Sequence, residues 1–187
     1  MGRTGHRLTG IAAGCLSACA LWSTFGPLSL AAIPAGYFGG TAPDWLEIAH
    51  AEYSTKYQRW MRKSVIPHRT ITHWWLVWVA LSALLAIWPF RFQADTLIRM
   101  AGAGFVAGAW MHLLMDIPNP TGIPIATPYA KSRFGFGWWK SGNALEPLAG
   151  VLMVGLAGLL LFGVAHRSLA AHGIFPIDVS TLFQAIP

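Results

Sequence analysis

The chain alternates between long apolar runs and short polar stretches. Three runs, 8–25, 71–88 and 145–165, are long enough to cross about 30 Å of hydrocarbon at about 1.5 Å per residue. A fourth run, 97–115, is interrupted only by Arg99 near one end, where its long side chain can reach the interface. This pattern predicts an all-α integral membrane protein.

A fifth apolar stretch, 27–40, decides the number of crossings. It is short, and Pro34 and Gly36 are expected to bend or end it. The sequence therefore predicts four to five transmembrane helices. With either number, the polar segments 44–70 and 116–144 emerge on the same side, because only two long runs separate them.

The basic residues favour five crossings, since most of them then lie on one face. Lys and Arg collect in cytoplasmic loops, so this face is expected to be cytoplasmic. The chain is thus predicted to be a multi-pass membrane protein with a cytoplasmic N-terminus. The expected cytoplasmic residues are Arg3, Arg7, Lys56, Arg59, Arg62, Lys63, Arg69, Lys131, Arg133 and Lys140, and those near the other face are Arg91, Arg99 and Arg167.

The first apolar run also has features of a cleaved leader. It follows a basic start, and "LSAC" resembles a lipoprotein cleavage site with Cys19 as the modified residue. The sequence after Cys19 stays apolar, which favours a retained first helix over cleavage. Cys15 and Cys19 then lie one helical turn apart and form neither a disulfide framework nor a CxxC metal site.

Two polar segments are expected to rest on the cytoplasmic membrane surface. "DWLEIAHAEYSTKYQRWMRK", residues 44–63, has apolar residues at near-helical spacing and predicts an interfacial amphipathic helix. Residues 117–143 are rich in Pro and Gly and predict an ordered loop, with Trp138 and Trp139 as interface anchors. We expect one membrane domain over residues 1–187.

Gly104 and Gly108 have GxxxG spacing within the fourth run. This spacing allows either close packing between helices of one chain or a face for a homo-oligomer.

Composition supports the membrane interpretation. The chain is 55% hydrophobic and 11% charged, whereas about a quarter of the residues in a soluble domain are charged. Its net charge of +6 fits cytoplasmic loops. No basic stripe is interleaved with exposed aromatic residues, so we expect membrane lipids as partners and no direct contact with nucleic acid.

"HLLMD" carries the first candidate chemistry. His112 and Asp116 are four residues apart, so their side chains share one face at a helix end. An imidazole nitrogen and a carboxylate oxygen there could bind a divalent ion. A His–Asp hydrogen bond that closes the helix end is the alternative.

"PHRTITHWW" places two more histidines at the start of an apolar helix. Thr70 or Thr72 is expected to cap that helix, which leaves His68 and His73 free to converge on a metal. Arg69 lies between them and is a candidate anion clamp, because guanidinium groups bind phosphate or carboxylate in bidentate fashion. Interfacial snorkelling of these side chains is the alternative.

Other ionisable residues can join this layer. Asp44 follows Thr41 by three residues, which fits either a helix-capping pattern or a metal ligand, and Glu47 is a candidate base. Glu146 opens the last helix, where a carboxylate interacts favourably with the helix dipole, and it too can face the site as a base. His6 joins this face if there are five crossings and is otherwise an interface residue.

Ionisable groups from several segments thus meet at one membrane edge, where each is costly to keep. The mixed nitrogen and oxygen set suits Zn²⁺, Mn²⁺ or Fe²⁺. No cysteine lies on this side, so a thiolate-rich structural zinc site is excluded. The candidate metal ligands are His6, Asp44, His68, His73, His112 and Asp116, and the candidate catalytic residues are Glu47, Arg69 and Glu146.

The motifs "GGTAPDW", "PHRTITHW" and "HLLMDIPNPTGIPIATPYAKSRFGF" resemble the LexA-binding, inner-membrane-associated metal-dependent hydrolase family. The similarity covers about residues 6–146. It implies a metal site at Asp44, His68, His73, His112 and Asp116, with Arg69 in the same motif set and His6 and Glu146 as further matches. The family often has PD-x-D, whereas this chain has Leu46 at the second Asp and Glu47 beside it, so the number of metal ions stays open.

These observations favour a metal-dependent hydrolase that acts at the cytoplasmic membrane interface on an amphiphilic lipid or phosphoester. The alternative is a non-catalytic membrane protein that uses the same polar layer for metal sensing, anionic-lipid binding or partner binding. A transporter is disfavoured, because the candidate ligands lie at helix ends and not at the bilayer midplane.

Overall fold

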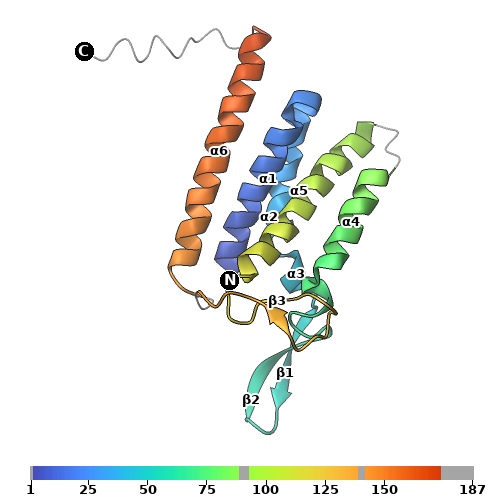
Figure 1. The fold of residues 1–187 in the computed structure, drawn as a ribbon, viewed down its shortest axis with the longest axis vertical. Helices are drawn as coiled ribbons and strands as arrows, with labels where there is room; N and C mark the ends of the chain where they lie inside the picture. The colour runs from blue at the N-terminus through green and yellow to red at the C-terminus, as the bar shows by residue number, and fades with distance from the viewer. Residues whose placement is uncertain (1, 89–92, 139–141, 174–187) are drawn as a thin grey trace, which may run out of the picture.

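The computed structural model describes residues 2–88, 93–138 and 142–173, and its long helices lie side by side (Figure 1). Most of the described chain is helical, as the apolar runs predict. The helices are α1 (Arg3–Phe25), η1 (Gly26–Ala31), α2 (Ala32–Gly39), α3 (Ala42–Trp45), η2 (Ile71–His73), α4 (Trp75–Ile87), α5 (Gln93–Asp116) and α6 (Leu145–Ala171). The strands are β1 (Ala49–Ser54), β2 (Arg59–Ser64), β3 (Ile123–Pro124) and β4 (Arg133–Phe134).

Three stretches of the described residues are long and apolar enough to cross a membrane. They are Arg3–Gly39, which contains α1, η1 and α2, then Asp95–Asp116 in α5, and Leu145–Ala171. Helix α4 is apolar but shorter, because residues 71–73 form the separate turn η2 and not its first turn. The protein is therefore a helical membrane protein, and the number of crossings stays a prediction.

The short apolar stretch 27–40 runs back along α1. Helix α1 ends at Gly26, whose φ of 53° is a conformation that favours glycine and reverses the chain. Helices η1 and α2 then run antiparallel to α1, since Gly14 faces Ala32 and Gly10 faces Gly36. The chain thus returns to the level at which α1 begins, as the interpretation with five crossings requires.

Glycines allow α1, α2 and α5 to approach each other closely. A Cβ atom on Gly104 would lie 2.1 Å from the carbonyl oxygen of Ala32, and one on Gly108 would lie 2.3 Å from that of Gly36. The GxxxG pair therefore packs within the chain against α2. Because both glycines are buried there, they are not a surface that a homo-oligomer could use.

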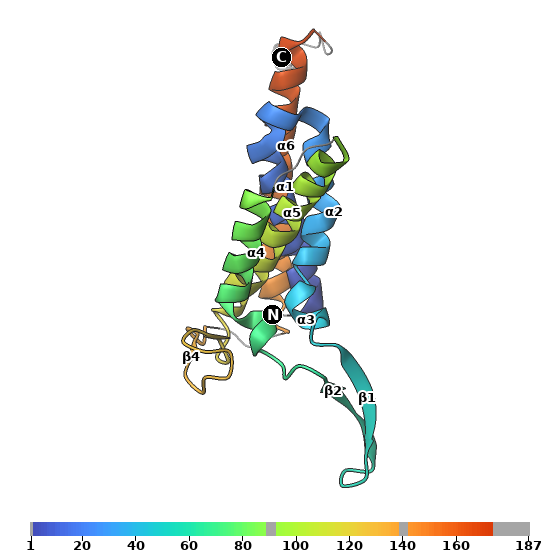
Figure 2. The ribbon, with the colours of Figure 1, turned by 90° about the vertical axis from the view of Figure 1, so that its right-hand side faces the viewer.

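Helix α5 lies at the centre of the helical layer and packs against α1, α2 and α4, while α6 packs along α1 (Figures 1 and 2). One apolar cluster joins α1 to α6 through Ala12, Ala18 and Ala157. A second cluster joins α4 to α5 through Trp78 and Leu113. These contacts fix the ends of the helices relative to one another.

The predicted interfacial helix over 44–63 is wrong. After the single turn of α3, strands β1 and β2 form an antiparallel hairpin that projects away from the helices (Figure 2). Tyr53 pairs with Trp60 across the strands, with ring centroids 5.6 Å apart, and Lys63 contacts Glu52 at 2.6 Å. Such cross-strand pairs stabilise a hairpin with both faces exposed, whereas a helix here would have no core to bury its apolar side. The protein is thus not purely all-α.

The structure describes residues 117–138 of the predicted Pro/Gly-rich loop. This segment carries the small β3–β4 sheet, and the Phe136 and Trp138 amides donate to the carbonyls of Ile117 and Pro118. Phe136 and Trp138 stack with centroids 4.9 Å apart. The predicted anchor Trp139 and the basic residues Arg91 and Lys140 lie outside the described residues.

We expect Gly104→Val to destabilise the fold by about 1–3 kcal/mol, because its side chain would force α5 away from α2. The measurement is the thermal midpoint of the purified protein in detergent. The matched control is Gly158→Val in α6, where a Cβ atom meets nothing within 4 Å. Equal midpoints for the two variants would contradict the close-packing account.

Candidate metal centre

A layer of buried polar side chains lies where α1 begins, where α2 leads into α3, around η2 and at the end of α5. These segments are far apart in sequence, but the packing of the helices brings their ends together (Figure 1). The buried ionisable and polar residues of this end are His6, Glu47, Arg69, Thr70, Thr72, His73, His112, Asp116, Asn119 and Glu146.

His73, His112 and Asp116 form the centre of this layer. The Nε2 atoms of the two histidines are 3.2 Å apart, and each is 3.6 Å from Oδ2 of Asp116. All three side chains are buried. The sequence predicted the His112–Asp116 pair on one helix face and His73 as a candidate ligand from a different segment, and the fold brings the three side chains together.

The hydrogen bond at Nδ1 determines the tautomer of His112. Its Nδ1 lies 2.8 Å from the carbonyl oxygen of Gly40, which can only accept a hydrogen bond. Nδ1 therefore carries the proton, and Nε2 of the neutral ring presents a lone pair toward His73 and Asp116. A backbone carbonyl on the second nitrogen is the arrangement that orients histidine ligands in metal sites.

His73 is held in its neutral form. It lies in η2, before the first residue of α4, and burial together with the neighbouring His112 lowers the pKa of its imidazole well below 6.5. Its Nδ1 is 3.1 Å from Oγ1 of Thr72 and 3.5 Å from Oε1 of Glu47. In the tautomer that places the proton on Nδ1, toward the Glu47 carboxylate, Nε2 also presents a lone pair.

The spacing of these donors fits a small divalent ion. Bonds of about 2.0–2.1 Å in a tetrahedral zinc site separate neighbouring ligand atoms by about 3.3–3.4 Å. The three distances in the His73–His112–Asp116 group are 3.2, 3.6 and 3.6 Å. Two neutral imidazoles and a carboxylate are also the donor types that zinc, manganese and iron accept. The residues therefore fit a metal ion.

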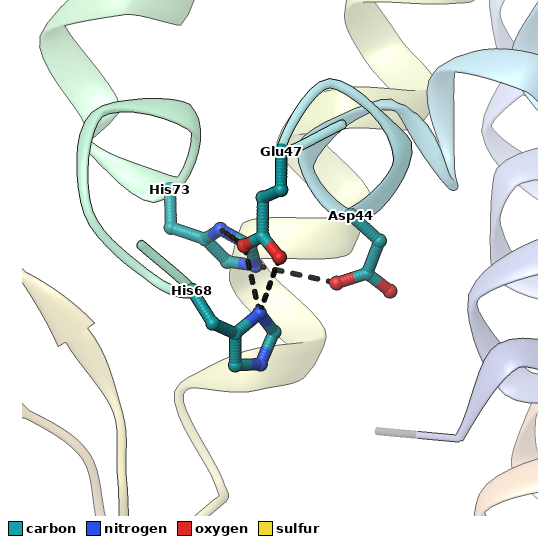
Figure 3. Close-up of side chains that lie close together, drawn as sticks. All are labelled: Asp44, Glu47, His68 and His73. Carbon is teal, nitrogen blue, oxygen red and sulfur yellow. Dashed lines mark hydrogen bonds and ion pairs between the residues drawn. The ribbon is translucent and has the colours of Figure 1, made fainter. Parts of the chain in front are cut away.

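Asp44 lies beside His73 (Figure 3) and is more exposed than the three residues of this group. Its Oδ1 is 3.7 Å from Nε2 of His73 and 3.9 Å from Nε2 of His112, and its side chain is 26% exposed. The predicted capping role is wrong, because α3 has no side-chain cap and the Thr41 hydroxyl donates to the carbonyl of Phe38 instead. The Asp44 carboxylate is thereby available to the histidines.

Glu47 and His68 form a pair beside the centre (Figure 3). The two oxygens of the buried Glu47 carboxylate lie 2.7 and 2.8 Å from Nδ1 of His68, and the carboxylate accepts the backbone N–H of Arg69 at 3.0 Å.

The predicted helix caps at Thr70 and Thr72 are wrong. Thr70 bonds the carbonyl of Pro67, and Thr72 contacts His73.

The backbone on both sides of this pair is strained. Ile48 has a φ of 52° and Arg69 a φ of 59°, the left-handed region that side chains with a Cβ rarely adopt. Both positions neighbour a residue of the Glu47–His68 pair. Such outliers persist where surrounding contacts over-determine them, and they cluster at functional sites.

His6 reaches the layer from the first turns of α1. Its ring stacks on that of His112 with centroids 3.6 Å apart, and its Nε2 is 3.6 Å from Oδ1 of Asp116. Its buried Nδ1 has no hydrogen-bond partner among the described residues. Donor atoms of His6, Asp44 and His112 lie within 4.8 Å of one another, so His6 belongs to the same ligand layer.

Arg69 orients Asp116. Its Nη2 donates to Oδ1 of Asp116 at 2.9 Å, while Nη1 contacts Oγ1 of Thr121 and the carbonyl of Gly122. Nδ2 of Asn119 also approaches Oδ1, at 3.3 Å. These contacts hold one carboxylate oxygen and direct the other, Oδ2, toward the two histidines. Both terminal nitrogens of the predicted anion clamp are thus engaged within the protein.

Glu146 lies apart from the donor groups that could hold a metal. Its Oε2 accepts the backbone N–H of Gly2 at 2.8 Å and that of Gly142 at 3.0 Å. It therefore connects the start of α1 to the start of α6, one helical turn from His6.

Sequence reasoning missed several contributors. The Gly40 carbonyl, the Thr72 and Thr121 hydroxyls and the Asn119 amide all contact site residues. Asn119 follows Asp116 by three residues, so the helix end could have suggested it. No sequence signal could have identified a backbone carbonyl.

The comparisons with known proteins agree with a membrane location. A family model described as "YdjM inner membrane protein" matches residues 1–179. No curated protein and no solved structure matches the chain.

We expect Glu146→Ala to lower the stability of the protein by about 1–3 kcal/mol, since two backbone donors lose their acceptor. Glu146→Gln keeps an acceptor oxygen and should cost less. The measurements are the thermal midpoint in detergent and the bound metal of both variants. A loss of metal at an unchanged midpoint would instead make Glu146 part of the metal centre.

Proposed function

This chain belongs to the YdjM inner membrane protein family, and we propose that it is a metal-dependent hydrolase of the membrane interface. The observation that carries the proposal is the convergence of two imidazole Nε2 atoms and one carboxylate oxygen at separations of 3.2–3.6 Å. The hydrolase activity is also what the motif resemblance implies.

In this proposal His73, His112 and Asp116 hold the ion, with Asp44 and His6 as further donors. When bound, a divalent ion lowers the pKa of a coordinated water and polarises the bond to be cleaved. The three buried ligands face away from solvent, and Asp44 is the partly exposed donor beside them. Water and substrate would therefore enter on the Asp44 side.

The sequence predicted His68 as a metal ligand, and its donor atom lies within 4.8 Å of those of Asp44, Glu47 and His73. Because Glu47 occupies its Nδ1, we assign the Glu47–His68 pair to proton transfer instead. Glu47 accepts the Nδ1–H of His68, so the lone pair of His68 lies on Nε2, and the side chain is 51% exposed. A positioned imidazole with this orientation can take a proton from the attacking water and return it to the leaving oxygen. Glu47 stabilises the imidazolium that forms in between, much as a carboxylate orients the histidine of a catalytic triad.

Arg69 acts as a positioning residue in this scheme. Its guanidinium holds Oδ1 of Asp116, so Oδ2 keeps its direction toward the histidines. Its own carbonyl accepts a hydrogen bond from Nη1 of Arg133 at 2.9 Å, which connects the loop after α5 to the same point.

We propose that the end of the molecule that carries the site lies on the cytoplasmic side of the membrane. The hairpin and the start of α1 bring most of the described basic residues to this end, and basic residues collect on the cytoplasmic side.

A second candidate is a non-catalytic membrane protein that senses metal. One observation favours it, because the polar side chains of the layer can form hydrogen bonds with one another when no ion is bound. If the Thr72 hydroxyl donates to Nδ1 of His73, then Nε2–H of His73 can donate to Nε2 of His112 across 3.2 Å. A metal ion held by Nε2 would require the ring proton of His73 to move to Nδ1, where Oε1 of Glu47 lies 3.5 Å away, so the hydrogen bonds of the layer would differ between its empty and occupied states.

We expect the purified protein to bind a first-row divalent metal at one equivalent or more, measured by elemental mass spectrometry. His112→Ala should reduce the bound metal at least tenfold, because it removes a buried ligand and the partner of His73. His50→Ala is the matched control, since His50 is exposed on the hairpin. A native protein without stoichiometric metal would sink the proposal.

A cleavage assay distinguishes the proposed hydrolase from the proposed sensor. We expect the reconstituted native protein to cleave amphiphilic esters or phosphoesters in vesicles, with chelation abolishing and metal restoring product formation. His68→Ala should retain the metal held by the buried ligands and lower the rate by about 10²–10⁴-fold, as loss of a general base does. Bound metal without cleavage of any tested ester would favour the sensor.

A further inference from the structure

Two arginines beside the metal centre have no role in the scheme above. Arg3 and Arg7 are exposed, lie one turn apart on α1, and line a cavity of about 510 Å³. The guanidinium carbon of Arg7 lies 5.6 Å from the ring centroid of Tyr37, another lining residue. Neither arginine has an ion pair with a carboxylate in the part of the chain that the structure describes.

This cavity reaches the metal centre through Asp44. Asp44 lines the cavity, and its Oδ1 is also 3.7 Å from Nε2 of His73. His6, between the two arginines in sequence, points to the buried side of α1, where it stacks on His112. The same turns of α1 therefore supply a candidate ligand on one side and two cations on the other.

A second, apolar cavity adjoins the first at Phe38, which lines both. It has a volume of about 570 Å³ and lies between α2, α4 and α5. Leu81, Leu84, Phe105 and Val106 are among its lining residues, and its surface is almost entirely apolar. These helices include apolar stretches able to cross a membrane, so the groove lies at the depth of lipid chains.

We propose that Arg3 and Arg7 bind the phosphate group of an anionic lipid, whose acyl chain lies in the apolar groove. The inference rests on the proposed function and names its substrate class. Guanidinium groups bind phosphate oxygens in bidentate fashion, and two of them match a doubly charged headgroup. A lipid without an anionic group would leave both arginines unpaired at the entrance to the metal centre.

The positions of the two cavities determine where the phosphate group and the acyl chain of such a lipid would lie. The phosphate lies between the arginines and Asp44, so its ester bond reaches the side on which Asp44 borders the histidines. The chain passes Phe38 into the groove between α2 and α4. Hydrolysis then breaks one bond to the phosphate and adds water across it, with the proton passing through His68.

The test is binding of dioctanoyl phosphatidic acid to the full chain in neutral detergent, read by native mass spectrometry. We expect R3Q/R7Q to bind it at least tenfold more weakly, since two charge-assisted contacts are lost. Binding of dioctanoylglycerol, which lacks the phosphate, should be unchanged. R59Q/K131Q is the matched control, because it also removes two charges outside both cavities and should bind within about twofold of the native protein.

Two further measurements distinguish binding of the phosphate group from binding of the acyl chain. Inorganic phosphate should bind far more weakly than the lipid, and equal binding would overturn the lipid as its source. Ala101→Phe, which places a large side chain in the groove, should weaken the lipid at least tenfold and leave inorganic phosphate unaffected. If R3Q/R7Q binds the lipid as the native protein does, or if R59Q/K131Q loses binding equally, the headgroup assignment is overturned.

Metal content, measured on the same samples, keeps the two proposals apart. R3Q/R7Q should retain the native amount of metal, because neither arginine contacts a ligand in the described residues. A native protein that binds phosphatidic acid through the arginines but holds no metal would overturn the hydrolase alone. Metal retained with unaltered lipid binding in R3Q/R7Q would overturn the headgroup site alone.

Discussion

The close approach of α1, α2 and α5 is the constraint on which the site depends. Where Gly10, Gly36 and Gly108 meet, backbones lie so near each other that a Cβ atom would overlap a carbonyl oxygen. In a membrane, helices gain little from hydrophobic burial, so tight packing of small residues supplies much of their association. One turn beyond Gly108, this packing brings the His112 ring against His6 and the Gly40 carbonyl.

Buried ionisable groups in this layer are tolerable because each one has a defined partner. The Gly40 carbonyl fixes the His112 tautomer, and Arg69 with Asn119 occupies one oxygen of Asp116. An isolated carboxylate there would be costly, whereas a paired and hydrogen-bonded one is not. The contacts that make burial tolerable also direct the remaining lone pairs toward one point, which is the property that a metal ligand requires.

The site lies at the end of the helices beside a basic cavity, which an apolar groove adjoins at Phe38. Asp44, in α3, lines the basic cavity next to the site, and Phe38, near the end of α2, lines both cavities. An amphiphilic molecule has its polar and apolar parts in the same order. If the protein hydrolyses such molecules, as we propose, it needs no separate domain for recognition, because the membrane already concentrates and orients its substrate.

The sequence by itself determined the apolar helices and singled out the residues of the polar layer, since hydropathy and i, i+4 spacing are local properties. It left open whether residues 27–40 return along the first helix, which the packing of Gly10 and Gly14 against that segment decided. It misassigned 44–63, because near-helical spacing over a short window cannot replace a core to pack against, and cross-strand pairs decided the hairpin. The caps expected at Thr41 and Thr72 failed for a related reason, since those hydroxyls found other partners. Only the tertiary structure decided which donors meet, because distances between side chains of different helices follow from packing that no local pattern contains.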